Sequence, residues 1–205
     1  MATKYGYCDV RGYLLHLLKD AYPTKWEVYQ IASVLGEDVF GSPKPHPNEV
    51  LKLFFDQNVR FALPVAAYRA GLGGFSSLIN NDPGLALPRL ALTSTLHGMD
   101  VIRSEVSRRA QSIVRDMSLK GCGDWRCVAN NDVNALEQRT EGLDDIYDVM
   151  VKGDGGDVLS PLSLGGHVVC ADCAKAAENR YYHLRATIWE VLPRSFKVGN
   201  SWEEI

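Results

Sequence analysis

The segment CADCAKAAENRYYHLRATIWEVLP, residues 170–193, combines a long helical pattern with two cysteines at its beginning. Its apolar side chains recur every three or four positions, as they do along one face of an amphipathic helix: Leu184, Ile188, Val191 and Leu192. The pattern predicts a helix from about Ala171 to Leu192. We expect it to end at or before Pro193, because proline has no backbone N–H with which to continue the helical hydrogen bonds.

The same periodicity recurs along the rest of the chain. It predicts further helices over residues 10–20, 24–36, 48–58, 60–70, 87–119, 132–139 and 143–151. We expect Asn48 to cap the third of these, Gly71 to end the fourth in a left-handed conformation, and a break near His97 and Gly98 to divide the fifth into two helices. Alternation with a period of two residues is scarce. The predicted fold class is therefore all-α, a multi-helix bundle-like domain.

Four of the five cysteines fall into two short pairs in the C-terminal half: Cys122, Cys127, Cys170 and Cys173. A structural Zn²⁺ takes four tetrahedral ligands, and a short C-x-x-C turn lets two thiolates converge on it. The sequence therefore predicts a zinc-stapled C-terminal half, in which the metal joins the end of one long helix to the beginning of another. Four thiolates leave no open position for water, so the predicted zinc is structural and not catalytic.

Other interpretations of the thiols remain open. Cys170 and Cys173 could form a redox pair, although such a pair usually follows a strand of an α/β sheet and the surroundings here are helical. Disulfides are a second alternative. His167 stands three residues before Cys170 and could replace one sulfur as a zinc ligand. Cys8 belongs to neither pair and is expected to pack as a small apolar residue.

The composition limits the class of protein. Of the 205 residues 46% are hydrophobic and 23% are charged, and the formal net charge is −3, as is ordinary for a globular domain. No apolar run approaches the roughly 20 residues that cross a bilayer. The chain begins MATKYGYCDV, without the basic and apolar regions of a secretory signal peptide. We therefore expect an intracellular protein, cytoplasmic or nuclear, that does not enter a membrane.

Basic residues gather in one predicted helix, but acidic residues stand among them: Arg103, Glu105, Arg108, Arg109, Arg115 and Asp116. This mixture is typical of a solvated helix face, and the negative net charge disfavours binding to nucleic acid. The sequence contains no nucleophile elbow, phosphate-binding loop or HExxH motif. His183 is expected to be a half-buried helix residue and not a general base, so we do not expect an enzyme.

Three blocks of sequence resemble one family. They are KYGYCDVRGYLLHLLKDAYPT (residues 4–24), EVLKLFFDQNVRFALPVAAYRAG (residues 49–71) and VVCADCAKAAENRYYHLRATIWEVLPRSFKVGNSWEEI (residues 168–205). The last block has a C-x-x-C that opens a helix, a W..LP..F pattern and a terminal Ser-Trp-Glu-Glu-aliphatic sequence, and Cys122 and Cys127 correspond to an earlier cysteine pair. Together these blocks resemble the C-terminal helical region that follows the BTB (POZ) domain in fungal BTB-domain proteins.

The resemblance implies two parts that pack as one structural unit. Residues 1–119 would be the end of a BTB domain with the helices after it, and residues 120–205 the helical region that carries the cysteine cluster. The chain would hold almost none of the BTB domain itself, as a truncated or shortened relative does. Dimerisation and cullin-ligase docking, which belong to that domain, are therefore not implied.

The expected function is that of a non-catalytic protein-interaction module or scaffold, as in the C-terminal part of an adaptor or regulator. Candidate contacts to a protein partner are the apolar residues near the C-terminus: Trp189, Phe196, Trp202 and Ile205. The alternative for these side chains is that they fold back and close the core. Alternative functions are a zinc-dependent nucleic-acid-binding regulator and, less favoured, an enzyme of unrecognised type.

Overall fold

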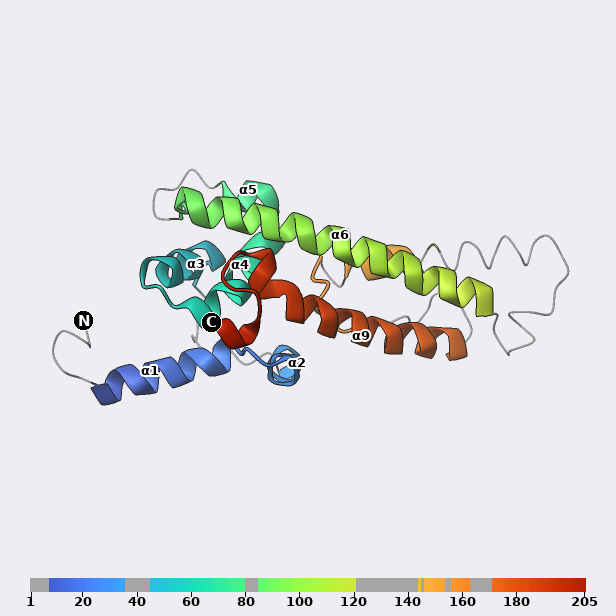
Figure 1. The fold of residues 1–205 in the computed structure, drawn as a ribbon, viewed down its shortest axis with the longest axis horizontal. Coiled ribbons are helices and arrows are strands. Elements are labelled where there is room, and N and C mark those ends of the chain that lie inside the picture. The colour runs from blue at the N-terminus through green and yellow to red at the C-terminus, as the bar shows by residue number, and fades with distance from the viewer. Residues whose placement is uncertain are drawn as a thin grey trace, which may run out of the picture. The chain divides into compact units, whose positions relative to one another are not determined.

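The computed structural model describes residues 8–35, 45–79, 85–120, 144, 146–153, 156–162 and 171–205. Within these ranges the regular elements are helices and no strand is present, so the predicted all-α class is confirmed (Figure 1). The elements are α1 (Cys8–Ala21), α2 (Trp26–Leu35), α3 (Pro47–Asp56), η1 (Arg60–Ala62), α4 (Leu63–Leu72), α5 (Gly74–Leu78), α6 (Arg89–Lys120), α9 (Ala171–Ser195) and η2 (Trp202–Glu204). Residues 146–152 are also helical. None of the described helices has both the length and the apolar character needed to span a bilayer.

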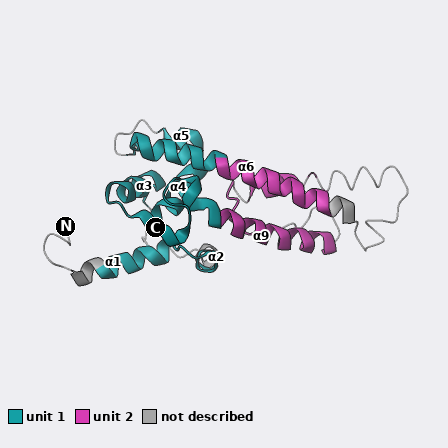
Figure 2. Ribbon diagram, in the orientation of Figure 1, with its two compact units in different colours: residues 1–100, 190–205 teal, residues 101–189 magenta. Residues whose placement is uncertain are grey.

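The chain divides into two compact units (Figure 2). The first comprises residues 1–100 and 190–205, and the second comprises residues 101–189. These units do not follow the boundary predicted after residue 119. Because most of residues 120–170 lie outside the described part of the chain, the predicted division at that point stays a prediction.

Helix α4 is buried over most of its length in the first unit. Its buried side chains are Val65, Ala66, Ala67, Tyr68 and Ala70, each at most 4% exposed. The alanines carry little volume, so neighbouring elements can approach closely, and α3, α5 and η1 all contact this helix. Close packing of small and large side chains is how a helical core reaches the density of a protein interior. Helix α4 therefore forms the centre of this unit.

An aromatic cluster joins the end of α1 to the same core. Tyr22 directly follows α1 and packs edge-on against Phe54 of α3, with 4.9 Å between the ring centroids. The guanidinium carbon of Arg69 on α4 lies 4.9 Å from the centroid of the Tyr22 ring. Edge-to-face aromatic pairs and cation–π contacts each contribute roughly 0.5–1.5 kcal/mol beyond their burial. Tyr22 thus anchors the end of α1.

The beginning of α3 differs from the sequence prediction, because His46 and not Asn48 is the N-cap. The Nδ1 atom of His46 accepts the backbone N–H of Asn48 at 3.2 Å, and the Glu49 carboxylate accepts the N–H of His46 at 3.1 Å. Pro47 suits the first helical position, where a missing N–H costs nothing. Asn48 is instead buried and donates from its side-chain amide to the Ser77 carbonyl at 2.7 Å, so it connects α3 to α5.

Two glycines that were expected to interrupt helices lie inside them. Gly71 is within α4 and Gly98 is within α6, which is a single helix, so the predicted break at His97 and Gly98 is wrong. A Cβ at Gly71 would overlap the side chain of Met99, and a Cβ at Gly98 would overlap the ring of Phe196. Glycine in a helix interior costs about 1 kcal/mol relative to alanine. At both positions the absence of a side chain leaves room for a neighbouring side chain. Close packing, and not the end of a helix, therefore explains both glycines.

Helix α9 also continues through Pro193 to Ser195, although its end was predicted at or before this proline. Burial of apolar side chains on both sides of Pro193 offsets the one hydrogen bond that it cannot donate. The helix closes at Lys197, which has a positive φ of 58°. The Lys197 N–H donates to the Arg194 carbonyl at 3.1 Å and the Val198 N–H donates to the Pro193 carbonyl at 2.9 Å. These two bonds form a Schellman motif with lysine where glycine is usual.

The second unit buries apolar side chains from α6, from residues 146–152 and 156–162, and from α9. They are Ile102, Val106, Ala110, Ile146, Met150, Val158, Leu159, Ala177, Tyr181, Leu184, Ile188 and Trp189. The apolar stripe predicted for the last helix is thus confirmed. The hydroxyls of Ser107 and Tyr147 share a hydrogen bond of 2.8 Å, which ties α6 to residues 146–152.

Two polar side chains of α9 hold residues 156–162 against this core. The Tyr181 hydroxyl donates to the Val158 carbonyl at 2.9 Å, and the Arg185 guanidinium donates to the Leu159 carbonyl at 3.0 Å. Burial raises the pKa of the Tyr181 phenol, so it stays protonated and remains a hydrogen-bond donor. Because both acceptors are buried backbone carbonyls, these bonds also satisfy groups that water does not reach.

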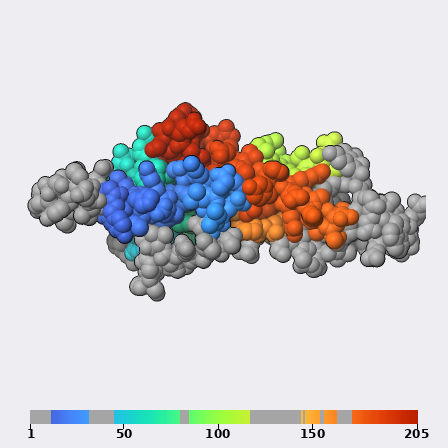
Figure 3. Space-filling view, turned by 90° about the horizontal axis from the view of Figure 1, so that it is seen from below, coloured from blue at the N-terminus to red at the C-terminus, as the bar shows by residue number. Residues whose placement is uncertain are grey.

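The first two helices leave apolar side chains at the surface. Tyr13 and Leu14 of α1 are 63% and 49% exposed, and Ile31 of α2 is 61% exposed. Figure 3 shows both helices, in blue, on the face seen from below. On its other side α2 buries Trp26 and Tyr29, whose rings stack with centroids 6.0 Å apart. The predicted helix over residues 10–20 is therefore present as α1, with part of its apolar stripe facing solvent.

Candidate docking groove

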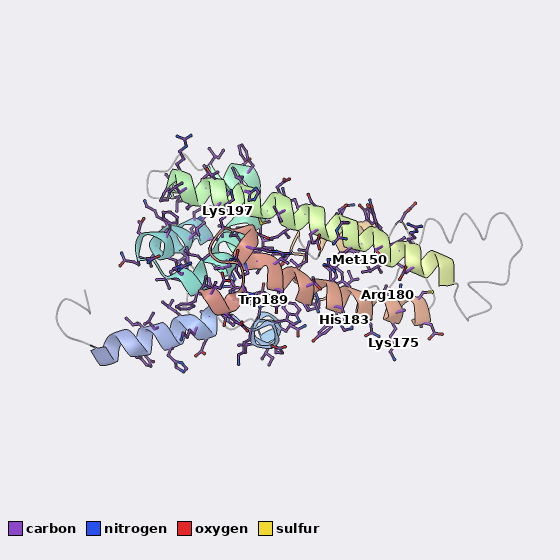
Figure 4. All side chains as sticks on the ribbon, in the orientation of Figure 1. Met150, Lys175, Arg180, His183, Trp189 and Lys197 are labelled. Carbon is purple, nitrogen blue, oxygen red and sulfur yellow. The ribbon has the colours of Figure 1, made fainter. Side chains whose placement is uncertain are left out.

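In the second unit, a groove with a volume of about 320 Å³ lies between α6 and α9. Helix α6 lines it with Arg108, Arg109, Ser112, Ile113 and Asp116, and α9 lines it with Arg180, His183, Leu184 and Thr187. On each helix these residues are spaced mainly three or four positions apart, which places them on one face. Figure 4 labels two of them, Arg180 and His183, along α9. The groove is thus built from two facing helix surfaces.

Glu105 fixes two of the arginines at the α6 edge of the groove. Its Oε1 accepts from Arg108 at 2.7 Å and from Arg109 at 2.6 Å, and its Oε2 accepts from the Nε of Arg108 at 3.0 Å. The pKa of Glu105 falls to about 2, chiefly because of the hydrogen bond from Arg108 and despite partial burial, which opposes the shift. A carboxylate with three donors stays ionised at all physiological pH values. Glu105 therefore holds both guanidinium groups in place and occupies part of their hydrogen-bonding capacity.

The lowered pKa of Glu105 predicts a pH-dependent contribution to stability. The pKa of Glu105 is about 2 in the folded state and near the ordinary glutamate value of 4.5 in the unfolded state, so the contribution is complete above pH 5 and is lost as the pH falls towards 2. Because such helix-surface pairs contribute roughly 0.3–0.5 kcal/mol each, we expect Glu105→Gln to lower the free energy of unfolding by about 1 kcal/mol at pH 7. Urea titrations between pH 3.5 and 7 measure this. An equal difference between the two proteins at every pH would contradict it.

Arg180 and Thr187 organise the α9 side of the groove. Arg180 donates to the backbone carbonyl of Ile113 at 3.3 Å, so its guanidinium is held across the gap between the two helices. The Thr187 hydroxyl donates to the carbonyl of His183 at 2.9 Å. His183 is exposed, whereas the sequence predicted a half-buried position. The polar rim of the groove therefore belongs to both helices.

The interior of the groove is apolar and its rim is mostly basic. Ile113 and the buried Leu184 provide apolar surface. The guanidinium groups around them can bind a carboxylate through paired N–H donors. Asp116, the acidic side chain in the lining, partly balances their charge. The arrangement suits a ligand that combines an apolar side chain with nearby carboxylates.

The sequence indicated the arginines on the α6 side of this groove, but it did not indicate that α9 forms the other side. The prediction of a solvated helix face holds for Arg103 and Arg108, which are exposed. The sequence does not link Arg180 and His183 to the arginines of α6, because no local pattern pairs α9 with that helix. The available signal was that Arg109 and Arg180 each directly precede a buried residue, Ala110 and Tyr181 respectively. Such positions lie at the edge of a helix-helix contact.

The predicted zinc site lies mainly outside the described residues. Cys122, Cys127 and Cys170, with the alternative ligand His167, are all in the part that the structure does not describe. Cys173 lies in the first turn of α9 and is partly exposed. Among the described residues no group of three or more His, Cys, Asp or Glu side chains could hold a metal ion. The zinc site therefore stays a prediction.

The predicted partner contacts separate into buried and accessible residues. Trp189 is fully buried in the second unit and Phe196 is 2% exposed in the first, so these two side chains close the core, as the alternative interpretation had it. Trp202 in η2 and the terminal Ile205 are partly exposed. Ile205 packs onto the turn at Gly199, where its Cγ2 would lie 2.7 Å from an added Cβ. The C-terminal residue thus folds back onto the turn that follows α9.

No family model, curated protein or solved structure matches the chain. The resemblance to the helical region after fungal BTB domains therefore stays a prediction.

Proposed function

We propose that this chain is a non-catalytic protein-interaction module that binds an acidic segment of a partner protein in the groove between α6 and α9. The observation that supports this most directly is the placement of three arginines from two helices around an apolar interior: Arg108, Arg109 and Arg180. Guanidinium groups recognise carboxylates through paired hydrogen bonds. Apolar contact with the interior of the groove would add affinity and would fix the position of the peptide along the groove.

The charge pattern favours an acidic peptide over a nucleic acid. A phosphate backbone carries closely spaced charges and would meet Glu105 and Asp116 beside the arginines. The net charge of −3 also repels an extended polyanion. A peptide can pack a leucine side chain against Ile113 and Leu184. Its carboxylates can then lie only at positions that face a guanidinium group. The proposed partner is therefore a protein with a short acidic and apolar segment.

The proposal includes a structural zinc as the staple of the C-terminal half. Cys173 lies in the first turn of α9, and the same helix carries Arg180 into the groove two turns later. A metal that fixed the beginning of α9 would therefore restrain one wall of the groove. The resemblance to the region after BTB domains agrees with an adaptor or regulatory role. Zinc would have no part in a reaction.

A fluorescent peptide in which glutamates flank leucines tests the proposed function directly. We expect saturable binding at low salt that weakens as salt is added, and weaker binding of the same peptide with glutamines. Arg108→Gln should weaken binding about tenfold, the effect of losing one charge-assisted hydrogen-bonding group. Glu105→Gln should strengthen binding about threefold, because it frees two guanidinium groups that Glu105 now occupies. Fluorescence anisotropy measures all of these affinities.

Arg103→Gln is the matched control, because Arg103 is exposed on α6 and does not line the groove. It removes the same charge and should leave the affinity within about twofold of the wild type. Equal binding of the glutamate and glutamine peptides would show that the groove does not read carboxylates. A DNA oligonucleotide that bound more tightly than the acidic peptide, with a steep salt dependence, would favour the alternative of a nucleic-acid-binding regulator.

A further inference from the structure

The first unit contains a pocket of about 230 Å³ that is apolar in its interior and basic at its opening. Leu51, Phe55 and Phe196 are among its apolar walls, and two exposed cations, Arg60 and Lys197, stand where the lining reaches the surface. Ligand sites in proteins typically combine an apolar interior with a few polar groups, in volumes of roughly 300–1,000 Å³ for drug-sized molecules. A pocket of this size suits a smaller molecule.

Thr95 gives the pocket an unusual polar group. It lies in α6, lines the pocket and is fully buried, and its hydroxyl has no hydrogen-bond partner among the described residues. Threonines in helices commonly bond to the carbonyl one turn earlier. Thr93 does so with Arg89 at 2.8 Å, and Thr187 of the second unit does so with His183 at 2.9 Å. Within the described part of the chain, Thr95 therefore has a hydroxyl without a hydrogen-bond partner at the wall of the pocket.

An unsatisfied buried hydroxyl is costly and needs an explanation. A ligand that enters the pocket would supply the missing partner. The cations at the opening indicate the charge of the other end of that ligand. Arg60 is already oriented, because it donates to the Val198 carbonyl at 2.6 Å. Arginine has five N–H donors, so this bond leaves others for a carboxylate.

We propose that this pocket binds a small aromatic carboxylate that carries a hydroxyl group at its far end. The ring would pack against Phe196 and Leu51, the ligand hydroxyl would bond to Thr95, and the carboxylate would meet Arg60 and Lys197 at the opening. The site lies within the first unit and does not depend on the peptide groove. It adds a small-molecule ligand to a protein-interaction module.

Three probes separate the parts of this proposal: 4-hydroxyphenylacetate, phenylacetate and 4-hydroxyphenethyl alcohol. We expect the full chain to bind 4-hydroxyphenylacetate best, as measured by ligand-observed NMR titration. Thr95→Val keeps the shape of the side chain and removes its hydroxyl. It should weaken the binding of 4-hydroxyphenylacetate and of 4-hydroxyphenethyl alcohol about tenfold and leave phenylacetate unchanged, because phenylacetate has no ring hydroxyl for Thr95 to bond.

The melting temperature of Thr95→Val distinguishes a ligand site from a structural hydroxyl. Removing an unsatisfied hydroxyl should leave the melting temperature unchanged or raise it. A lower melting temperature with unchanged affinity for all probes would show that Thr95 has a structural role, and would overturn the proposal. So would the absence of saturable binding by all three probes.

Lys197→Asn tests the basic opening. Asparagine tolerates the positive φ at this position, so the variant removes the charge without disturbing the cap. We expect the affinity for both carboxylates to fall about threefold and the affinity for the alcohol to stay constant. An equal loss for the alcohol would contradict recognition of the carboxylate at this end. Neither result depends on the groove variants, so this proposal can fail while the proposed function stands.

Discussion

Replacement of Cys173 by serine is expected to remove bound zinc and to unfold at least the C-terminal half of the chain. The prediction follows from the two cysteine pairs, of which Cys173 is the member at the start of α9. Structural zinc sites in small peptides have apparent binding free energies of about 10–16 kcal/mol at neutral pH, and this energy is also folding energy. Whole domains are stable by only about 5–15 kcal/mol. Loss of a thiolate ligand is therefore large enough to unfold the region.

The position of Cys173 explains which part of the chain should respond first. The same helix supplies five side chains to the core of the second unit: Ala177, Tyr181, Leu184, Ile188 and Trp189. If the beginning of α9 is no longer fixed, these side chains lose part of their packing. Circular dichroism at 222 nm during a thermal scan should show a lower and broader transition. Elemental analysis of the purified protein should find one zinc per chain in the wild type and less in the variant.

Cys8→Ser is the control, because Cys8 belongs to neither pair. It should retain zinc and melt like the wild type to within a few degrees. A chelator should lower the melting temperature of the wild type and of Cys8→Ser, and have little further effect on Cys173→Ser. Unchanged helicity and melting after complete metal removal would falsify the structural role of zinc. A wild type that contained no metal when purified under reducing conditions would contradict the site itself.

The helical periodicity in the sequence was sufficient for the fold class and for most helix positions. The stripe of α9 is buried as predicted, because a face that is apolar every three or four residues is stabilised by leaving water. Predictions that relied on single glycine or proline residues as helix ends failed more often. Gly98 and Pro193 both look like helix ends, but tertiary packing holds the helices together through them. Propensity is a weak preference that a well-packed neighbour overrides.

Only the α6 side of the candidate groove was predictable from the sequence, because local spacing does not reveal which helices pack together. The sequence places Arg108 and Arg109 near Glu105, and the helical spacing alone implies their ion pairs. No local pattern states that α9 lies against this part of α6, so the contribution of Arg180 required the structure. The same is true of the Thr95 pocket, whose walls come from segments far apart in the chain. Long-range proximity was the missing information at both sites.

Gly98→Ala is expected to destabilise the protein by about 1–3 kcal/mol, although alanine is the better helix former. In an open helix interior this change stabilises by about 1 kcal/mol. At Gly98 the added Cβ would overlap the Phe196 ring and lie 2.9 Å from its Cγ. Phe196 is 2% exposed, so its ring has little room to move, and overpacking of this kind typically costs 1–3 kcal/mol. Urea denaturation at neutral pH measures the sign of the change.

Gly12→Ala supplies the control for helix propensity alone. Gly12 lies within α1, where an added Cβ would meet nothing within 4 Å, so this variant should be more stable than the wild type by up to about 1 kcal/mol. Phe196→Leu in the Gly98→Ala background should recover part of the loss, because a smaller side chain leaves space for the methyl group. The double-mutant cycle should then show a coupling of about 1 kcal/mol. Two results would contradict this role of Gly98. One is that the effects of Gly98→Ala and Phe196→Leu are additive, and the other is that Gly98→Ala stabilises the protein as much as Gly12→Ala does.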